Sequence, residues 1–304
     1  LLKEAGFDVT GVYMKCWLEG EACTSIDDER SARLAAAHLG IHFYVWNFVD
    51  EYKERVVDYM LKGYREGITP NPDVMCNKEI KFGLFYDKAI SLGADYVATG
   101  HYASIERIGE ESKIMAGVDS DKDQTYFLSF IDKEKLSRIL FPLGKYTKPQ
   151  VRELARKYAL PNAERRESQG ICFIGKVEVE SFLKEHIIPK EGNIVDIEGN
   201  VLGIHEGAYY YTIGQRRGIK LPGGPYYVVN KDVKANTVVV STNEEDIERN
   251  EVLVKNINWF VVPQENQTAV HVKIRYRQED TPATLEKQGT DSCKLVFDHP
   301  QRAV

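Results

Sequence analysis

The first hundred residues alternate two hydrophobic patterns, and this alternation limits the folds that the chain can adopt. Short runs rich in β-branched and aromatic residues predict strands at 7–13, 41–48 and 94–100. The spacing of apolar residues between these runs predicts amphipathic helices at 25–40, 51–65 and 77–92. Strands separated by helices form parallel sheets through right-handed crossovers, with helices on both faces. We therefore predict an α/β domain built on a parallel sheet.

The rest of the chain changes character. Thr147, Pro149 and Gln150 predict the capped start of a helix. A second short helix is predicted at 179–186, among Gly-rich turns. Alternating runs typical of antiparallel strands follow at 250–262, 268–278 and 291–300. We predict three domains: an α/β domain at 1–177, a small mixed central domain at 178–243, and a C-terminal antiparallel β-barrel or sandwich at 244–304.

Composition excludes several classes of protein. The 304 residues, 43% hydrophobic and 28% charged, are typical of a folded chain, and no apolar run is long enough to cross a membrane. The five cysteines are irregularly spaced and form no CxxC pair, so we predict neither a disulfide framework nor a structural metal site. This cysteine usage indicates a reducing compartment, either the cytoplasm or an organelle matrix. The net charge of −6 argues against bulk attraction to nucleic acid but allows a local basic patch.

The stretch TPNPDVMCNKEIKFG places Cys76 where a proline-stiffened loop meets a predicted helix. The positive end of the helix dipole favours a thiolate there, and Lys78 and Lys81 add positive charge. Asp73, three residues upstream, is close enough to carry a proton or to orient the thiol. The alternative is a buried cysteine that acts only as a small hydrophobic residue.

The stretch RRESQGICFIG holds a second candidate, Cys172, between Gly170 and Gly175. Glycines on both sides allow unusual backbone angles and the close approach of a substrate. The alternative is a cysteine in a buried strand. We interpret the remaining cysteines as structural: Cys16, Cys23 and Cys293.

Three further groups of residues are candidates for binding a ligand. Met14, Gly100 and His101 follow predicted strands, and ligands of open α/β sheets bind beyond the carboxyl ends of the strands. For Met14 the alternative is an ordinary core methionine. Lys122, Asp123 and Gln124 form a second group. We interpret them as a hydrogen-bonding cluster, and the alternative is an ordinary solvated loop. In VKIRYRQ, strand alternation puts three cations on one face, which suits a phosphate backbone or simply solubilises the strand: Lys273, Arg275 and Arg277.

Together these motifs resemble the tRNA-specific 2-thiouridylases, which place sulfur on the wobble uridine of certain tRNAs. The resemblance covers the chain from about Val9 to Val304. It rests on the order and spacing of GVYMKCW, TPNPDVMCNKEIKFG, ATGHYA, DSDKDQTYFLS, FPLGKYTKPQVRELA, SQGICFIG, HEGAYYYTIGQRRGI, PYYVVNKD and KIRYRQ. It implies a sulfurtransferase that uses ATP with Mg²⁺ to adenylate the uracil C2 oxygen. The implied partners are tRNA and a persulfide-carrying donor protein, with no membrane.

The resemblance also implies residue roles. Cys172 carries the persulfide, Cys76 is the second nucleophile and Asp73 is the acid or base, and the two cysteines form a disulfide after turnover. Met14 and Gly100 would bind the nucleotide. Contacts to the target base or the rest of the tRNA would come from Asn71, Pro72, Asp73, His101, Lys122, Asp123, Gln124, Arg275 and Tyr276. The implied domains are nucleotide-binding and catalytic, then tRNA-binding, then a β-barrel.

One departure from the family pattern concerns ATP. Family members open with a strand and a glycine-rich SGGVDSS loop that holds phosphates at a helix start, and this sequence has no such loop. We therefore expect the α/β domain and the β-barrel to be incomplete, with a preceding segment of roughly twenty to thirty residues. We also expect that the chain as written does not adenylate uridine unaided. The alternatives are a non-catalytic tRNA-binding remnant, another ATP-pyrophosphatase such as an amidotransferase or argininosuccinate synthase, and a dithiol redox protein.

Overall fold

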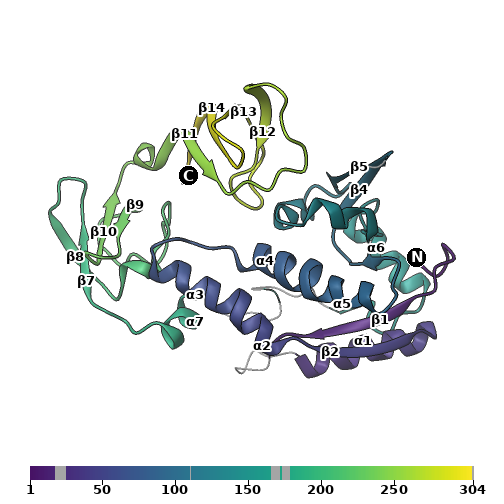
Figure 1. Cartoon of the computed structure of the whole chain (residues 1–304). Coiled ribbons are helices and arrows are strands. Elements are labelled where there is room, and N and C mark those ends of the chain that lie inside the picture. Colours follow the sequence, from purple (N-terminus) through teal and green to yellow (C-terminus); the bar gives the residue numbers. More distant parts are fainter. Residues whose placement is uncertain (18–24, 110, 166–171, 173–178, 303–304) are drawn as a thin grey trace. The chain divides into compact units, whose positions relative to one another are not determined.

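The computed structural model (Figure 1) describes residues 1–17, 25–109, 111–165, 172 and 179–302. The chain divides into two compact units. The first unit contains Leu1–Asp58 and Asn71–Val177, and the second contains Tyr59–Pro70 and Glu178–Val304. The division into three domains stays a prediction. Among the described residues, no helix is long and apolar enough to span a bilayer.

Parallel strand pairing in the first unit is confirmed. β1 (Thr10–Lys15) runs parallel to β2 (His42–Asn47), and α1 (Ser25–Leu39) lies alongside this pair (Figure 1). β3 (Val97–Ala98) pairs in parallel with β6 (Ile139–Leu140). A hairpin of β4 (Ala103–Ile108) and β5 (Glu111–Ala116) follows β3. Among the described strands, the predicted parallel sheet is therefore present as two separate pairs.

Two strand predictions in this unit were wrong in their bounds. The first strand begins at Thr10 rather than at residue 7. The strand predicted at 94–100 is only two residues long. Its early carbonyls are taken by a side chain, because the Arg138 guanidinium donates to the carbonyls of Ala94 at 2.6 Å and Asp95 at 2.7 Å. These two carbonyls therefore bond to a side chain rather than to a neighbouring strand, and β3 begins only at Val97.

Two helical runs contain stretches of π-helix, which is rare and recurs at functional sites. The first consists of α2 (Val49–Tyr52), a π-helical stretch Lys53–Val57 and α3 (Asp58–Arg65). The second consists of α4 (Pro72–Met75), a π-helical stretch Cys76–Phe85 and α5 (Tyr86–Ser91). The backbone leaves helical angles at Gly83, where a Cβ atom would lie 2.8 Å from the Lys78 carbonyl oxygen. Only glycine fits this kink without a shift of the chain.

The second run begins earlier than the predicted start at Asn77. The Asn71 side-chain oxygen accepts hydrogen bonds from the backbone N–H groups of Asp73 at 3.0 Å and Val74 at 3.2 Å. Pro72 occupies the first helical position, where its missing N–H costs nothing. The predicted cap of α6 (Lys148–Lys157) is confirmed, since the Gln150 side chain accepts from the Thr147 N–H at 2.8 Å.

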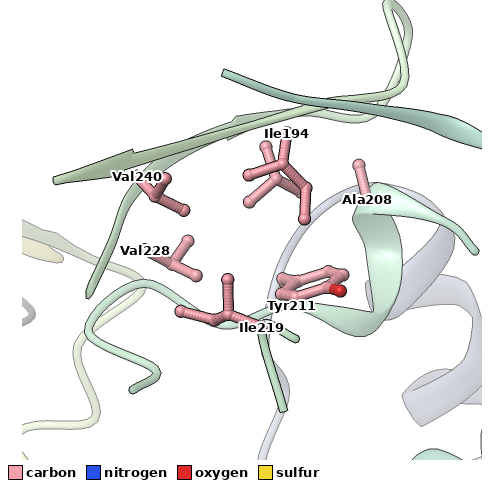
Figure 2. Packing of buried hydrophobic residues seen from close by; sticks show 7 residues of the cluster. Ile194, Ala208, Tyr211, Ile219, Val228 and Val240 are labelled. Atoms are coloured by element: carbon pink, nitrogen blue, oxygen red, sulfur yellow. The ribbon is translucent and has the colours of Figure 1, made fainter. Parts of the chain in front are cut away.

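The second unit begins its C-terminal part with α7 (Val179–His186), as predicted. A mixed sheet follows in the order β8-β7-β10-β9. Its strands are β7 (Gly192–Val195), β8 (Val201–His205), β9 (Tyr227–Asp232) and β10 (Thr237–Ser241). Figure 2 shows the core beneath this sheet, in which Ile194, Val228 and Val240 face Tyr211 and Ile219.

The end of the chain is an antiparallel sheet in the order β11-β14-β13-β12. Its strands are β11 (Glu248–Lys255), β12 (Gln267–Val272), β13 (Thr281–Lys287) and β14 (Ser292–Arg302). β13 was not predicted, because Pro282 lies within it and proline is unfavourable inside strands. The α/β start and the antiparallel β end are both as the sequence predicts.

The Asn71 cap gives a test of the fold. Asn71→Ala removes the acceptor for two N–H groups, so we expect the free energy of unfolding to fall by about 1 kcal/mol. Asn71→Asp keeps an acceptor at the same position and should stay close to the original protein. Urea denaturation followed by circular dichroism measures both variants, and an equal loss in the two would contradict the capping role.

Candidate active site

The structure brings together two cysteines that are far apart in the sequence. Cys76 is fully buried at the start of the π-helical stretch Cys76–Phe85, and Cys172 is half-buried. Their side chains form a hydrogen bond, and both are free thiols. A pairing that could not be decided from the sequence is thus present in the fold.

Both peptide groups that flank Cys172 are hydrogen-bonded to side chains. The Cys172 N–H donates to Oδ1 of Asp73 at 2.9 Å. The Cys172 carbonyl oxygen accepts from the Tyr52 hydroxyl at 2.5 Å. Asp73 lies in α4, one turn before Cys76, and Tyr52 is the last residue of α2. Two helices therefore hold Cys172 beside Cys76.

The two thiols differ in their acidity. Burial, together with the neighbouring Cys172, raises the pKa of Cys76 well above its usual value. The hydrogen bond from Cys76 lowers the pKa of Cys172 to about 7 despite its burial, and the charge of Lys81 lowers it further. An ordinary cysteine has a pKa of about 8.5. Near neutral pH a substantial fraction of Cys172 is therefore thiolate, whereas Cys76 remains a thiol.

Lys81 provides the positive charge of this cluster. Burial acts to lower the pKa of Lys81, but Cys172, Cys76 and Asp73 outweigh it and raise the pKa above its ordinary value. A π-helix repeats its hydrogen bonds at i and i+5, so Lys81 lies on the same side of the helix as Cys76. Lys78 is exposed instead, with its ammonium 3.5 Å from Glu79.

The expectation that the helix start makes Cys76 the thiolate was wrong. The helix begins at Pro72, so the Cys76 N–H already bonds to the carbonyls of Pro72 and Asp73. Burial then makes Cys76 the weaker acid of the pair. Burial also raises the pKa of Asp73, although the Cys172 N–H and Lys81 oppose this. A raised pKa suits a carboxylate that exchanges protons.

A third thiol, that of Cys16, lies close to the pair, and the sequence did not predict this proximity. Cys16 follows β1 and is 2% exposed. Burial first, and then the neighbouring Cys172, raises the pKa of Cys16. Cys293 packs in the core of the C-terminal sheet, as expected of a structural cysteine, and Cys23 lies outside the described residues.

Residues predicted to bind the nucleotide or tRNA lie in several places. Met14 is half-buried in β1, and Gly100 follows β3. His101 is 7% exposed, bonds to the Thr99 hydroxyl at 2.8 Å and packs between Phe82 and Phe141. Burial and the charge of Lys81 hold the pKa of His101 well below its usual value. His101 is therefore neutral, and its contact with tRNA stays a prediction.

The cluster Lys122, Asp123 and Gln124 shapes a loop. Asp123 is buried and accepts from the Thr125 hydroxyl at 2.7 Å, and the Gln124 side chain accepts from the Tyr102 N–H at 3.0 Å. Lys122 is half-buried. These bonds fix the backbone of the loop, whereas a role of the three residues in binding tRNA stays a prediction.

The predicted strand through Arg275 and Tyr276 was wrong. β12 ends at Val272, and the Gln278 N–H donates to the Arg275 carbonyl at 3.1 Å in a turn. Arg277 has a φ of +67°, a left-handed conformation that ends any strand. The Arg277 guanidinium lies 5.4 Å from the centre of the Tyr276 ring. Arg275 is exposed, so the basic residues lie on a turn rather than on a strand face.

Comparison with known proteins adds to this geometry. Residues 1–176 match the family model "tRNA methyl transferase HUP domain", residues 180–242 match "tRNA methyl transferase PRC-barrel domain", and residues 249–304 match "Aminomethyltransferase beta-barrel domain". Proteins named tRNA-specific 2-thiouridylase MnmA from Listeria welshimeri and Listeria monocytogenes are 42% identical, and one from Bacillus pumilus is 41% identical. Each alignment covers 100% of this chain and 84% of the relative.

Replacing Lys81 tests the electrostatics of the site. Lys81→Met removes the cation that favours the Cys172 thiolate, so we expect the pKa of Cys172 to rise from about 7 toward the ordinary thiol range. At pH 7 the thiolate fraction, and with it the rate of alkylation, should fall. Mass spectrometry of peptides labelled with iodoacetamide across a pH series measures this midpoint.

The matched control is Lys78→Met, on the same helix but exposed to solvent. This variant should leave the alkylation midpoint of Cys172 unchanged. Equal midpoints for the two variants would show that Lys81 does not stabilise the thiolate.

Proposed function

Since the chain belongs to the family of tRNA-specific 2-thiouridylases, we propose that it replaces the C2 oxygen of a tRNA wobble uridine with sulfur at the expense of ATP. The observation that carries the proposal is the hydrogen-bonded pair of Cys76 and Cys172 beside Lys81. In such a reaction one cysteine carries the sulfur and a second cysteine then attacks it to release the product. The two cysteines must therefore be adjacent, and a difference in acidity lets one act before the other.

The first step loads sulfur onto Cys172. Its thiolate attacks the outer sulfur of a persulfide on a donor protein, the donor's S–S bond breaks, and the donor leaves as a thiolate. A pKa of about 7 keeps much of Cys172 ionised at neutral pH, and Lys81 stabilises the persulfide anion that results. Cys76 remains a thiol in this step because burial raises its pKa.

ATP activates the uridine. The uracil C2 oxygen attacks the α-phosphorus, pyrophosphate leaves, and the oxygen becomes part of an AMP leaving group. Met14 and Gly100 would line the nucleotide at the carboxyl ends of β1 and β3. Mg²⁺ would enter with the ATP phosphates, because this ion is commonly bound through substrate phosphates.

Sulfur transfer then uses both cysteines. The terminal sulfur of the Cys172 persulfide attacks C2 and AMP leaves, which joins Cys172 to the base through an S–S bond. The Cys76 thiolate attacks the Cys172 sulfur, so the S–S bond to the base breaks and the thiolated uridine is released. Asp73 lies one helical turn away and has a raised pKa, which supports a role for it in accepting the Cys76 proton. The resulting Cys76–Cys172 disulfide is reopened by a dithiol reductant.

Specificity for tRNA is part of the same proposal. The target uridine must leave its stack to reach the half-buried Cys172 and the buried Cys76 behind it. Asn71, Pro72 and Asp73 lie at the start of α4 beside Cys76, where a flipped base would arrive. The exposed Arg275 would offer its charge to the phosphate backbone of the RNA, and the neighbouring Tyr276 an aromatic ring on which a base can stack.

Removing the carrier cysteine tests the proposal. We expect Cys172→Ser to abolish thiolation of tRNA while it leaves folding and tRNA affinity nearly unchanged, because a hydroxyl cannot carry a persulfide. Nucleoside mass spectrometry of tRNA incubated with ATP, a sulfur donor and the purified protein measures the product. Cys293→Ala, in the C-terminal sheet, is the control that should keep activity. Thiolation at normal rates by Cys172→Ser would refute the proposal.

The basic turn gives an independent prediction about binding. Arg275→Ala should weaken tRNA affinity and reduce the slope of log affinity against log salt by about one, the effect of one lost phosphate contact. Filter binding at several salt concentrations measures the slope, and the exposed Lys255 of β11 provides the control Lys255→Ala. An unchanged slope for Arg275→Ala would mean that this turn does not contact the RNA backbone.

A further inference from the structure

We propose that Tyr52 is a positioning residue, whose hydroxyl works with the Asp73 carboxylate to hold Cys172 so that its sulfur faces Cys76 and Lys81. The inference rests on the proposed function, because sulfur transfer is the reason why the Cys172 sulfur must be held in one position. The hydrogen bonds themselves are independent of any assigned activity: 2.5 Å from the Tyr52 hydroxyl to the Cys172 carbonyl and 2.9 Å from the Cys172 N–H to Asp73.

The position of Tyr52 suits a rigid donor. Its side chain is fully buried, with 0% of its surface exposed, and its ring meets the edge of Trp17 at a centroid distance of 6.4 Å. A buried phenol that contacts an indole has little freedom to turn. Burial and the nearby thiols also keep the pKa of Tyr52 above its usual value, so the group stays a hydroxyl and remains a donor.

The two hydrogen bonds act on opposite ends of one residue. Asp73 holds the peptide group before Cys172, and Tyr52 holds the peptide group after it. One bond alone would leave the residue free to pivot about it, whereas two bonds define the direction of the Cα–Cβ bond. Disulfides form only when the two Cα atoms lie within about 7 Å and the Cβ atoms point toward each other. Losing Tyr52's bond should therefore slow attack between Cys76 and Cys172.

The alternative is that Tyr52 has only a packing role in the core beside Trp17. Tyr52→Phe separates the two explanations, because it keeps the ring and removes only the hydroxyl. The variant should fold, since the packing volume is retained. Tyr64→Phe in α3 is the matched control, because Tyr64 is also a buried tyrosine in a helix of the same run.

The experiment uses the full chain without ATP or tRNA. One measurement is the rate at which the Cys76–Cys172 disulfide forms under the thiol oxidant diamide, followed by mass spectrometry of unreduced peptides. The other is the pH midpoint for alkylation of Cys172 by iodoacetamide. We expect Tyr52→Phe to slow disulfide formation roughly two- to tenfold, the effect of one lost hydrogen bond, and to move the midpoint upward from about pH 7.

The outcomes separate this inference from the proposed function. If Tyr52→Phe matches Tyr64→Phe in both measurements, the positioning role is wrong, even if Cys172 proves essential for thiolation. If Tyr52→Phe shows both changes while Cys172→Ser still thiolates tRNA, the positioning role stands and the proposed function fails. A change in the disulfide rate alone would also support positioning, because core packing without the hydroxyl would leave that rate unaltered.

Discussion

The hydrogen bond between Cys76 and Cys172 is the interaction on which the rest of the site depends. It lowers the pKa of the Cys172 thiol, while burial raises the pKa of the Cys76 thiol, so Cys172 is the stronger acid of the two. A buried thiolate is costly unless a cation lies beside it, and Lys81 meets that need. The pKa of each of these three groups therefore depends on the other two, and a substitution of one changes the pKa values of the others.

Local rules predicted much of the fold. The bounds of α7 and the hydrogen bond of Gln150 in the α6 cap follow from patterns within a few residues. The parallel pairing of β1 with β2 follows from the order strand, helix, strand. The two cysteines were also identifiable, since Cys76 follows a proline loop and Cys172 lies between glycines. These signals are local, so they survive without knowledge of the tertiary structure.

The rest depended on contacts that no local pattern contains. Tyr52 looks like an ordinary core residue until Cys172 is placed beside it. The start of α4 depends on a cap from Asn71, which the sequence analysis assigned to the substrate instead. Arg277 turns the chain after β12 with a positive φ that is uncommon for arginine, so alternation of side chains wrongly extended the strand. In each case a specific tertiary or backbone contact overrode the periodic pattern.

The π-helical stretch Cys76–Phe85 has a consequence for how this segment tolerates change in length. Each π-helical turn accommodates one residue more than an α-helical turn, so the stretch behaves as an α-helix that carries an insertion. Deleting one residue between Cys76 and Lys81 would restore ordinary α-helical geometry and strengthen the backbone hydrogen bonds. A five-residue π-helical step and a four-residue α-helical step turn the chain by nearly the same angle, so the lysine would stay on the side of Cys76. A deletion within α4 would instead rotate Asp73 by about a hundred degrees away from the thiols, so the π-helical stretch is the part of this run that can lose a residue without moving the site.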